Sequence, residues 1–327
     1  MTSDMIRDGL SRRDVLKGIA GLSGVAALGS AAMPTLASTR RVRDFYGDEI
    51  DLQGDVKVEK LADNIYVLSG VGGNIAILTG KDDTLQIDSG NPGTTAAVQK
   101  GTKTVTDKAV NTLINTHWHG DHTGGNEDLG KIGGRIFAHD NVRTRLGSDQ
   151  FIEAFNSKVP AHPAIALPIV TFDDKMTVHH NGEVLHLTHV PPAHTDGDIT
   201  ILFEKANILH AGDLFFNGMY PFIDSSTGGW IGGMAKAADQ ILAMTDDSTK
   251  IIPGHGPVGN KQQFKVYRDM LVKVESIMTP LVKSGKTAAE IVAAKPLAEL
   301  DGKWGMGFMK PETFIPVVYG GIKKFGM

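Results

Sequence analysis

Residues 116–122 place three histidines and one aspartate within six positions of the chain. This stretch follows an apolar run at residues 112–115 and precedes a glycine-rich segment at residues 123–126. A buried strand that breaks into a glycine-rich turn is where an α/β sheet presents its chemistry, at the carboxyl end of the strand. Imidazole nitrogens and carboxylate oxygens at this density suit zinc and similar divalent metals. The cluster therefore predicts an α/β fold with a metal site.

Three more segments lead from an apolar run to a side chain that can bind a metal, and they end at His194, Asp213 and His255. In a layered α/β fold the carboxyl ends of such strands meet at one edge of the sheet, so the four segments can converge. The resulting candidate set is His117, His119, Asp121, His122, His194, Asp213 and His255. Seven ligands are enough for two metal ions.

The chain contains no cysteine, so its metal ligands are limited to nitrogen and oxygen and it forms no disulfide. A protein without disulfides depends on core packing and bound metal for its stability. With 327 residues, 41% apolar and 21% charged, it can bury a large core. The net charge of −4 and the lack of a basic stripe argue against a nucleic-acid partner.

Residues 1–37 have the pattern of an export signal. Ser11, Arg12, Arg13 and Lys17 form a twin-arginine motif, which precedes a stretch rich in glycine and alanine at residues 18–33 and small residues at 35–37. The stretch of 16 residues is shorter than the about 20 that a membrane span needs. We predict a removed signal rather than an anchoring helix. Resemblance to such signals implies the twin-arginine export machinery as a partner, the bacterial periplasm as the location, and no stable membrane anchor.

The rest of the chain alternates strand and helix patterns, and we expect a surface arm at residues 38–55, one domain at 56–273 and a C-terminal helical extension at 274–327. Strands are predicted at residues 65–68, 75–78, 84–87, 112–115, 135–138, 199–203, 207–210 and 250–253. Asn181 and Gly182 predict a hairpin turn. Helices are predicted at residues 94–106, 141–146, 231–244, 261–283 and 287–294, and residues 147–168 are predicted to be an irregular, proline-rich flap.

Five motifs in this order resemble the metallo-β-lactamase superfamily over residues 56–273. They are Asp88-Ser89-Gly90, residues 115–122, Pro192 to Gly197, Leu209 to Asp213, and Ile252 to Gly256. The resemblance implies an α/β fold of the αββα sandwich type, with two mixed β-sheets flanked by helices. It also implies a metal-dependent hydrolase.

The same resemblance implies a role for each ligand. His117, His119 and His194 would hold one Zn²⁺, Asp121, His122 and His255 would hold the other, and Asp213 would bridge them. Two metals in such sites lie about 3.5–4 Å apart and share a water whose pKa falls toward 7. This water would lose a proton, and the resulting hydroxide would attack a carbonyl carbon of the substrate. Asp121 would be the catalytic residue, which orients the hydroxide and relays the proton. Iron or manganese remain alternatives to zinc.

Departures from individual branches narrow the function. Phe216 stands where one lactamase branch has a substrate-binding lysine and where lactonases have a tyrosine. Asp196 stands where glyoxalase II enzymes usually have proline, and His119 where flavodiiron proteins have glutamate. These departures leave a periplasmic hydrolase of an ester, lactone, thioester or amide as the expected function. A β-lactamase without a cysteine ligand is one form of it. The alternatives are a mononuclear iron dioxygenase of sulfur compounds and a metal-binding accessory protein without turnover. Substrate and oligomeric state stay open.

Several further residues have two readings. Asp88 either caps a turn or supports a metal ligand, and Asp196 and Asp198 either contact substrate or stabilise a turn. In the glycine-rich loop at residues 218–233, Tyr220, Phe222 and Trp230 are predicted to wall a substrate pocket, the alternative being that they anchor the loop. The other histidines are predicted to be surface or hydrogen-bonded core residues: His139, His162, His179, His180, His186, His189 and His210.

Overall fold

The computed structural model describes residues 41–43, 49–51 and 56–326. The predicted export signal lies outside the described residues. Within the predicted arm, β1 (Arg41–Arg43) and β2 (Glu49–Asp51) form an antiparallel pair. The described residues belong to one compact unit. No described helix has the length and apolar character that a membrane crossing requires.

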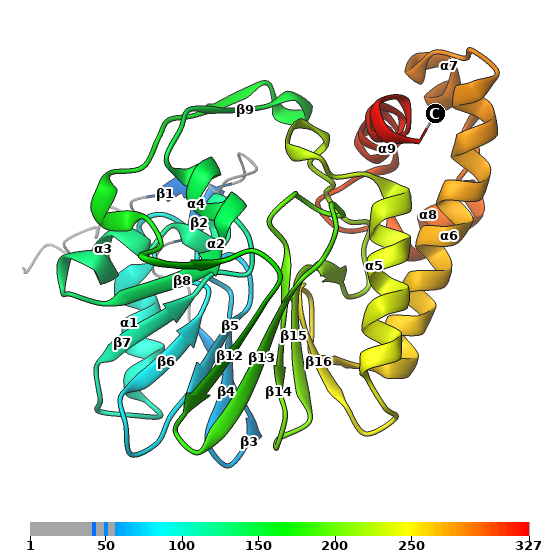
Figure 1. The fold of residues 1–327 in the computed structure, drawn as a ribbon. Helices are drawn as coiled ribbons and strands as arrows, with labels where there is room; N and C mark the ends of the chain where they lie inside the picture. Colours follow the sequence, from blue (N-terminus) through cyan, green and yellow to red (C-terminus); the bar gives the residue numbers. More distant parts are fainter. Residues whose placement is uncertain (1–40, 44–48, 52–55, 327) are drawn as a thin grey trace, which may run out of the picture. The chain divides into compact units, whose positions relative to one another are not determined.

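Two sheets face each other in this unit (Figure 1). The first has seven strands in the order β11-β8-β7-β6-β5-β4-β3 and the second has six in the order β12-β13-β14-β15-β16-β17. Both mix parallel and antiparallel neighbours: β6, β7, β8 and β11 are parallel, as are β15 and β16.

The strands of the first sheet are β3 (Lys57–Ala62), β4 (Ile65–Ser69), β5 (Ile75–Leu78), β6 (Thr84–Ile87), β7 (Val110–Ile114), β8 (Arg135–His139) and β11 (Val170–Phe172). Those of the second are β12 (Lys175–His180), β13 (Glu183–His189), β14 (Ile199–Phe203), β15 (Ile208–Phe216), β16 (Lys250–His255) and β17 (Gly259–Asn260).

The helices are α1 (Thr95–Lys103), α2 (Gly120–Thr123), α3 (Asn126–Lys131), α4 (Asp140–Leu146), α5 (Ile231–Met244), α6 (Lys261–Lys283), α7 (Ala288–Ala294), α8 (Ala298–Trp304) and α9 (Pro311–Phe325). Helices α1 and α3 lie beside the first sheet, and α5 and α6 beside the second (Figure 1). The fold is therefore the expected αββα sandwich.

Side chains that point alternately to the two faces of the first sheet build an apolar core on each side of it. In β5, Ala76 and Leu78 join the cluster between the sheets, whereas Ile75 and Ile77 pack with Val98 of α1. Successive side chains of a strand point to opposite faces, so a strand covered on both sides is apolar throughout. The second sheet contributes Leu187, Phe203 and others to the same inter-sheet cluster.

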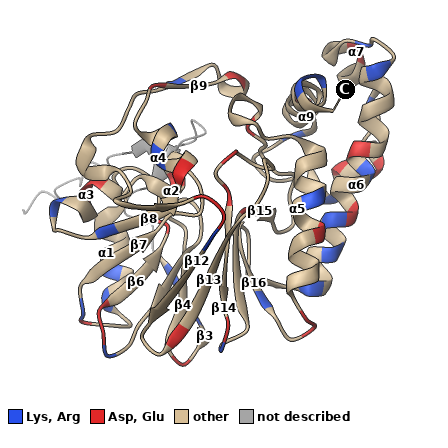
Figure 2. Cartoon of the chain, viewed as in Figure 1, with Lys and Arg blue, Asp and Glu red and all other residues tan. Residues whose placement is uncertain are grey.

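Helices α5 and α6 cover the outer face of the second sheet, and α9 packs against these helices in the same apolar cluster. Helix α6 buries one stripe that includes Phe264, Tyr267 and Leu271, and its other face carries charges of both signs (Figure 2). Asn260 caps its first turn by accepting a hydrogen bond from Gln263 N. Periodicity and cap together explain why the predicted bounds of α6 match the structure, and periodicity alone accounts for those of α5.

Three predictions about local structure were incomplete. The flap at residues 147–168 contains a short antiparallel pair, β9 (Gln150–Ile152) with β10 (Ser157–Val159), because Asn156 turns the chain at φ 48° and the prolines lie beyond the pair. The strand expected to stop at His210 continues to Phe216 along its parallel partner β16. The predicted boundary between residues 273 and 274 falls inside α6, and the domain division stays a prediction.

The inter-sheet core generates a stability prediction. Phe203 in β14 is fully buried, and replacing it with alanine leaves a cavity between two sheets that cannot easily collapse. Phe203→Ala should cost about 3–5 kcal/mol of unfolding free energy, measured by urea denaturation with an unchanged m value. Ile132→Ala, at a side chain that is 61% exposed, serves as the control and should change the unfolding free energy by less than about 0.5 kcal/mol. Equal losses in the two variants would contradict this core assignment.

Candidate metal centre

The four predicted segments do converge at one edge of the two sheets. His117 and His119 follow β7, and Asp121 and His122 lie in the short helix α2. His194 lies in the turn after β13, and His255 is the last residue of β16. Asp213 lies within β15 rather than beyond its end, at a position where the register with β16 shifts. Gly212 permits this register shift, because it adopts a φ of 50° and, having no Cβ, lets the strand pass close to Thr116.

Three histidines and Asp213 form the first group of ligands, whose atoms lie within 4.8 Å of one another. His119 Nδ1 is 3.1 Å from His117 Nε2 and 2.8 Å from His194 Nε2. All three rings are buried. Three ring nitrogens this close in a dry site repel one another through their lone pairs unless a proton or a cation lies among them.

The second group consists of Asp121, His122 and His255, also within 4.8 Å. Asp121 Oδ2 is 3.1 Å from His255 Nε2 and 3.5 Å from His122 Nε2. Asp121 and His122 are buried, and the His255 side chain keeps 17% of its surface exposed. This group is therefore the side of the centre that solvent reaches.

Asp213 contacts both groups. Its Oδ1 is 3.0 Å from His122 Nε2, while its Oδ2 is 3.4 Å from His194 Nε2 and 3.5 Å from His255 Nε2. Glycine at position 254 leaves room for this carboxylate, because a Cβ there would overlap Asp213 Oδ1. The structure thus brings all seven predicted residues together, with Asp213 between the two groups.

Three of the rings are hydrogen-bonded through their outer nitrogen, which directs the proton of the neutral ring to that side. His117 Nδ1 lies 3.1 Å from Thr116 Oγ1, a hydroxyl that itself donates to Asp88. His122 Nδ1 donates to Asp88 Oδ2 at 2.7 Å, and His194 Nδ1 to the Phe222 carbonyl at 2.9 Å. A ring that donates on one side presents a lone pair on the other, which is the tautomer a metal needs.

Buried polar atoms in the centre also fit a metal. Among residues 56–326, both carboxylate oxygens of Asp121 and of Asp213 and the Nε2 of His122 are buried without a hydrogen-bond partner. Such groups are costly to bury unless a charge compensates them. Nitrogen and oxygen donors without sulfur suit zinc, iron or manganese. The residues present therefore fit the metal pair that the motifs predicted.

Electrostatics divides the centre into two halves. Burial lowers the pKa of His194 to about 4, and burial followed by the His122 charge holds the pKa of His117 well below its ordinary value. Burial also opposes charge on His255, yet Asp213 and Asp121 outweigh it and raise that pKa to about 9. The pKa of His122 is likewise raised well above normal by its carboxylate neighbours, against burial. The second half thus attracts positive charge.

Asp88 is the supporting carboxylate that the sequence left open. It accepts hydrogen bonds from Thr116 N, Thr116 Oγ1 and His122 Nδ1, at 2.8, 2.7 and 2.7 Å. Its backbone has φ 62°, a left-handed conformation that few residues adopt. Asp88 therefore orients His122 directly and His117 through Thr116, and the turn-cap reading alone is insufficient.

Asp224 is a residue that the sequence reasoning missed. Its Oδ2 lies 3.2 Å from His119 Nε2, and it is 1% exposed. The contact opposes the effect of burial and leaves the pKa of Asp224 below its ordinary value. A lone aspartate in the otherwise apolar segment at residues 220–224 was the available signal.

Asp196, Asp198 and Tyr220 have structural roles rather than the substrate contacts that the sequence also allowed. Asp198 accepts from the backbone N–H groups of His194 and Thr195, and Asp196 pairs with Arg145 at 2.6 Å. Tyr220, expected to wall a pocket, is fully buried and donates to Asp301. The pocket prediction was wrong for Tyr220 because the C-terminal helices, which the sequence could not place, cover it.

The two remaining aromatic residues of that loop differ from each other. Phe222 is also fully buried, with its ring 5.6 Å from that of His119, so it backs the metal centre. Trp230 is half-buried and lies beside a separate cavity with Pro191 and Pro192. His210 is a hydrogen-bonded core residue, as predicted, with Nε2 3.2 Å from the Asn74 carbonyl.

The approach to the centre runs past His255. A cavity of about 550 Å³ is lined by His255, by the turn containing Gly70, Gly72 and Asn74, and by part of β3. Asn74 donates from Nδ2 to the carbonyls of Pro253 and Gly256, which fixes the His255 segment against this turn. Phe216 stacks on the ring of His255, with centroids 5.1 Å apart.

Comparison with known proteins agrees with this geometry. A family model described as the metallo-beta-lactamase superfamily matches residues 68–255. The chain is 22% identical over 225 residues to a metallo-beta-lactamase type 2 of Bacteroides fragilis, covering 65% of this chain and 84% of that protein. It is 28% identical over 164 residues to a hydroxyacylglutathione hydrolase of Nitrosococcus oceani, covering 49% of this chain and 54% of the relative.

A solved structure extends the likeness beyond the matched family region. The stereoselective inverting sec-alkylsulfatase Pisa1 from Pseudomonas sp. aligns with a TM-score of 0.62 at 16% identity, over 88% of this chain and 57% of that one. At this identity the match shows the fold alone. Its coverage exceeds the 57% of this chain that residues 68–255 represent, so the shared fold reaches outside the family region.

The packing of Asp213 against Gly254 generates a prediction about metal content. In Gly254→Ala, the new methyl group must displace the Asp213 carboxylate, so zinc retained after gel filtration should fall and zinc affinity should weaken by about 10-fold or more. Gly302→Ala is the matched control, because a Cβ at Gly302 meets nothing within 4 Å. Wild-type zinc content in Gly254→Ala, measured by atomic absorption, would contradict the bridging position of Asp213.

The raised pKa values generate a prediction about pH. In chelator-treated protein at pH 7, His255, with a pKa of about 9, is protonated. A metal requires the neutral ring. Zinc binding at pH 7 should therefore release a proton, and apparent affinity should rise as the pH increases toward 9. Calorimetric titration in two buffers of different ionisation enthalpy measures this release, and identical heats in both buffers would rule it out.

Proposed function

Because the chain belongs to the metallo-β-lactamase superfamily, we propose that it is a dinuclear zinc-dependent hydrolase of a carbonyl ester, lactone, thioester or amide, β-lactams included. One observation carries the dinuclear part of this proposal: Asp213 contacts His194 with one carboxylate oxygen and His122 with the other. A carboxylate shared between two groups of ligands supports two adjoining metal sites rather than one. A mononuclear iron centre would leave the second group, Asp121, His122 and His255, without a metal to bind.

The residues of the chain supply orientation and charge. When bound, a metal pair lowers the pKa of water toward 7 and polarises the carbonyl under attack. His117, His119 and His194 would hold one ion, Asp121, His122 and His255 the other, with Asp213 shared. Asp88 and Thr116 accept hydrogen bonds, directly or in sequence, from the outer nitrogens of His122 and His117, so that each neutral ring presents its inner nitrogen to a metal.

Asp121 is the proposed catalytic residue. Both of its carboxylate oxygens are buried and unmatched by hydrogen bonds among the described residues 56–326, and Oδ2 faces His255 at 3.1 Å. Burial opposes its charge, but His122 and His255 keep its pKa below the ordinary value. An ionised carboxylate at this place can orient an attacking water and hold its proton at Oδ2 before passing it to the leaving group.

The relatives support water attack on an acyl group without naming the substrate. One is named a β-lactamase and another a hydroxyacylglutathione hydrolase. In this chain Phe216 packs on His255, and its side chain offers neither a charge nor a hydrogen bond to a substrate carboxylate. We therefore favour substrates that do not require a cationic contact at this position.

We also propose export to the periplasm through the twin-arginine pathway, with removal of residues 1–37. The support is Ser11, Arg12, Arg13 and Lys17 together with the glycine- and alanine-rich stretch that follows them. Export in a folded state would suit a protein whose metal centre draws ligands from both sheets.

The proposed function is tested by a hydrolysis panel on the zinc-loaded chain with nitrocefin, a lactone, a thioester, an aryl ester, an alkyl sulfate and a phosphodiester. We expect about two zinc ions per chain and turnover of at least one carbonyl substrate. His119→Ala should reduce kcat/KM by more than about 100-fold.

The matched control for this test is His186→Ala, because His186 is a partly exposed histidine that pairs with Glu204. It should keep wild-type activity. Full activity in His119→Ala would show that the assigned centre is not the active site. One iron and no zinc in the purified protein would favour the dioxygenase instead.

A further inference from the structure

The loop that follows β15 contacts two of the histidines in the first ligand group. Asp224 Oδ2 lies 3.2 Å from His119 Nε2, and the Phe222 carbonyl accepts from His194 Nδ1 at 2.9 Å. The backbone N–H of Asp224 also donates to the His194 carbonyl at 2.9 Å. Residues 222–224 therefore hold the outer sides of both rings.

The Asp224 contact decides which nitrogen of His119 faces the centre. An ionised carboxylate only accepts hydrogen bonds, so the proton of the neutral ring lies on Nε2 and Nδ1 carries the lone pair. That Nδ1 is the atom that lies 3.1 Å from His117 Nε2 and 2.8 Å from His194 Nε2. A carboxylate behind a ligating histidine also makes the ring a stronger donor to a metal.

Asp224 is itself held in place by its own turn. Thr227 Oγ1 donates to Oδ2 at 2.8 Å, and Ser226 N donates to Oδ1 at 2.9 Å. The backbone carbonyl of Asp224 accepts from Gly229 N at 2.8 Å. Glycine is needed at position 229, since a Cβ there would overlap the His194 carbonyl. The carboxylate therefore has little freedom to move away from His119.

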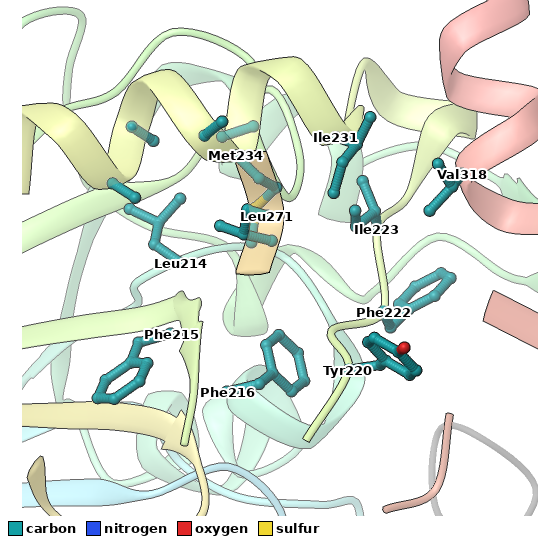
Figure 3. Packing of buried hydrophobic residues seen from close by; sticks show 14 of the residues in the cluster. Leu214, Phe215, Phe216, Tyr220, Phe222, Ile223, Ile231, Met234, Leu271 and Val318 are labelled. Carbon is teal, nitrogen blue, oxygen red and sulfur yellow. The ribbon is translucent and has the colours of Figure 1, made fainter. Parts of the chain in front are cut away.

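The C-terminal helices brace the start of this loop at Tyr220. Its hydroxyl donates to Asp301 in α8 at 2.9 Å, and its backbone N–H donates to the Trp304 carbonyl at 2.8 Å. Its ring stacks on Phe314 of α9, with centroids 4.1 Å apart and planes at 12°. Figure 3 shows Tyr220, Phe222 and Ile223 in one packed cluster with Val318 of α9.

We infer that Asp224 is a positioning residue for the first metal site, and that α8 and α9 brace it through Tyr220. The C-terminal extension thereby becomes part of the apparatus that sets metal affinity. This inference deepens the proposed function and rests on one part of it, that His117, His119 and His194 bind a metal. It does not depend on which substrate is hydrolysed.

Asp224 is tested by competitive zinc titration and by the visible spectrum of the cobalt(II)-loaded full chain. Asp224→Ala should weaken zinc binding at one of the two sites by about 10- to 100-fold and shift the cobalt bands. Asp224→Asn should lose less than about 10-fold, because its amide oxygen still accepts from Nε2. Asp246→Ala is the matched control: Asp246 also accepts several hydrogen bonds in a turn, but from Asn207 and Ser248. It should leave both measurements unchanged.

The brace is tested with Tyr220→Phe, which removes only the hydroxyl that reaches Asp301. Losing one partly buried hydrogen bond should weaken zinc binding at the same site by about 2- to 10-fold. Tyr319→Phe, at a half-buried tyrosine of α9, is the control and should bind zinc as the wild type does. Wild-type affinity in Tyr220→Phe would overturn the role of the brace.

Wild-type zinc affinity and cobalt spectrum in Asp224→Ala would overturn the role of Asp224, even if the metal-free variant melts at a lower temperature. If Asp224→Ala does not fold, Asp224→Leu decides, because it keeps a side chain of similar size and removes the acceptor for His119 Nε2; wild-type zinc affinity and cobalt spectrum in that variant also reject the inference. A wild-type chain that binds two zinc ions but hydrolyses no substrate would contradict the proposed function while leaving this inference in force. A wild-type chain that binds no metal would overturn both.

Discussion

The structure depends on the burial of two carboxylates and five imidazoles in one small volume. Neither Asp121 nor Asp213 finds a hydrogen-bond donor among the described residues 56–326, and ring nitrogens face one another at about 3 Å. Groups like these are unfavourable to bury unless opposite charge lies among them. The sheets therefore hold a centre whose donors suit bound cations, and the centre in turn joins both sheets at one edge.

Two further carboxylates give the centre its geometry from opposite sides. Asp88, at the end of β6, serves His122 and, through Thr116, His117. Asp224, in the loop after β15, serves His119. Each belongs to a different sheet's connections, so the precise placement of the ligands depends on how the two sheets pack. A sandwich with a rigid apolar core between its layers meets that requirement.

Local sequence patterns alone predict many of the helices and strands that build the two layers. The helices at residues 231–244 and 261–283 follow from apolar periodicity, and the second also from its Asn260 cap, both of which act within a few residues. The strand that continues through Asp213 to Phe216 could not be predicted in the same way, because its extension depends on pairing with β16 far along the chain. Tyr220 reads as a pocket residue until the C-terminal helices are placed over it.

The seven candidate ligands were determined by the sequence itself, since their chemistry and their position after apolar runs are local properties. Which nitrogen of each ring faces the centre, and that Asp224 supports His119, was decided only by the tertiary structure. Asp196 and Asp198 are near His194 in the chain, whereas Asp224 reaches His119 across 105 positions. Orientation of a ligand is set by contacts in space, and these exist only once both sheets and the C-terminal helices have packed.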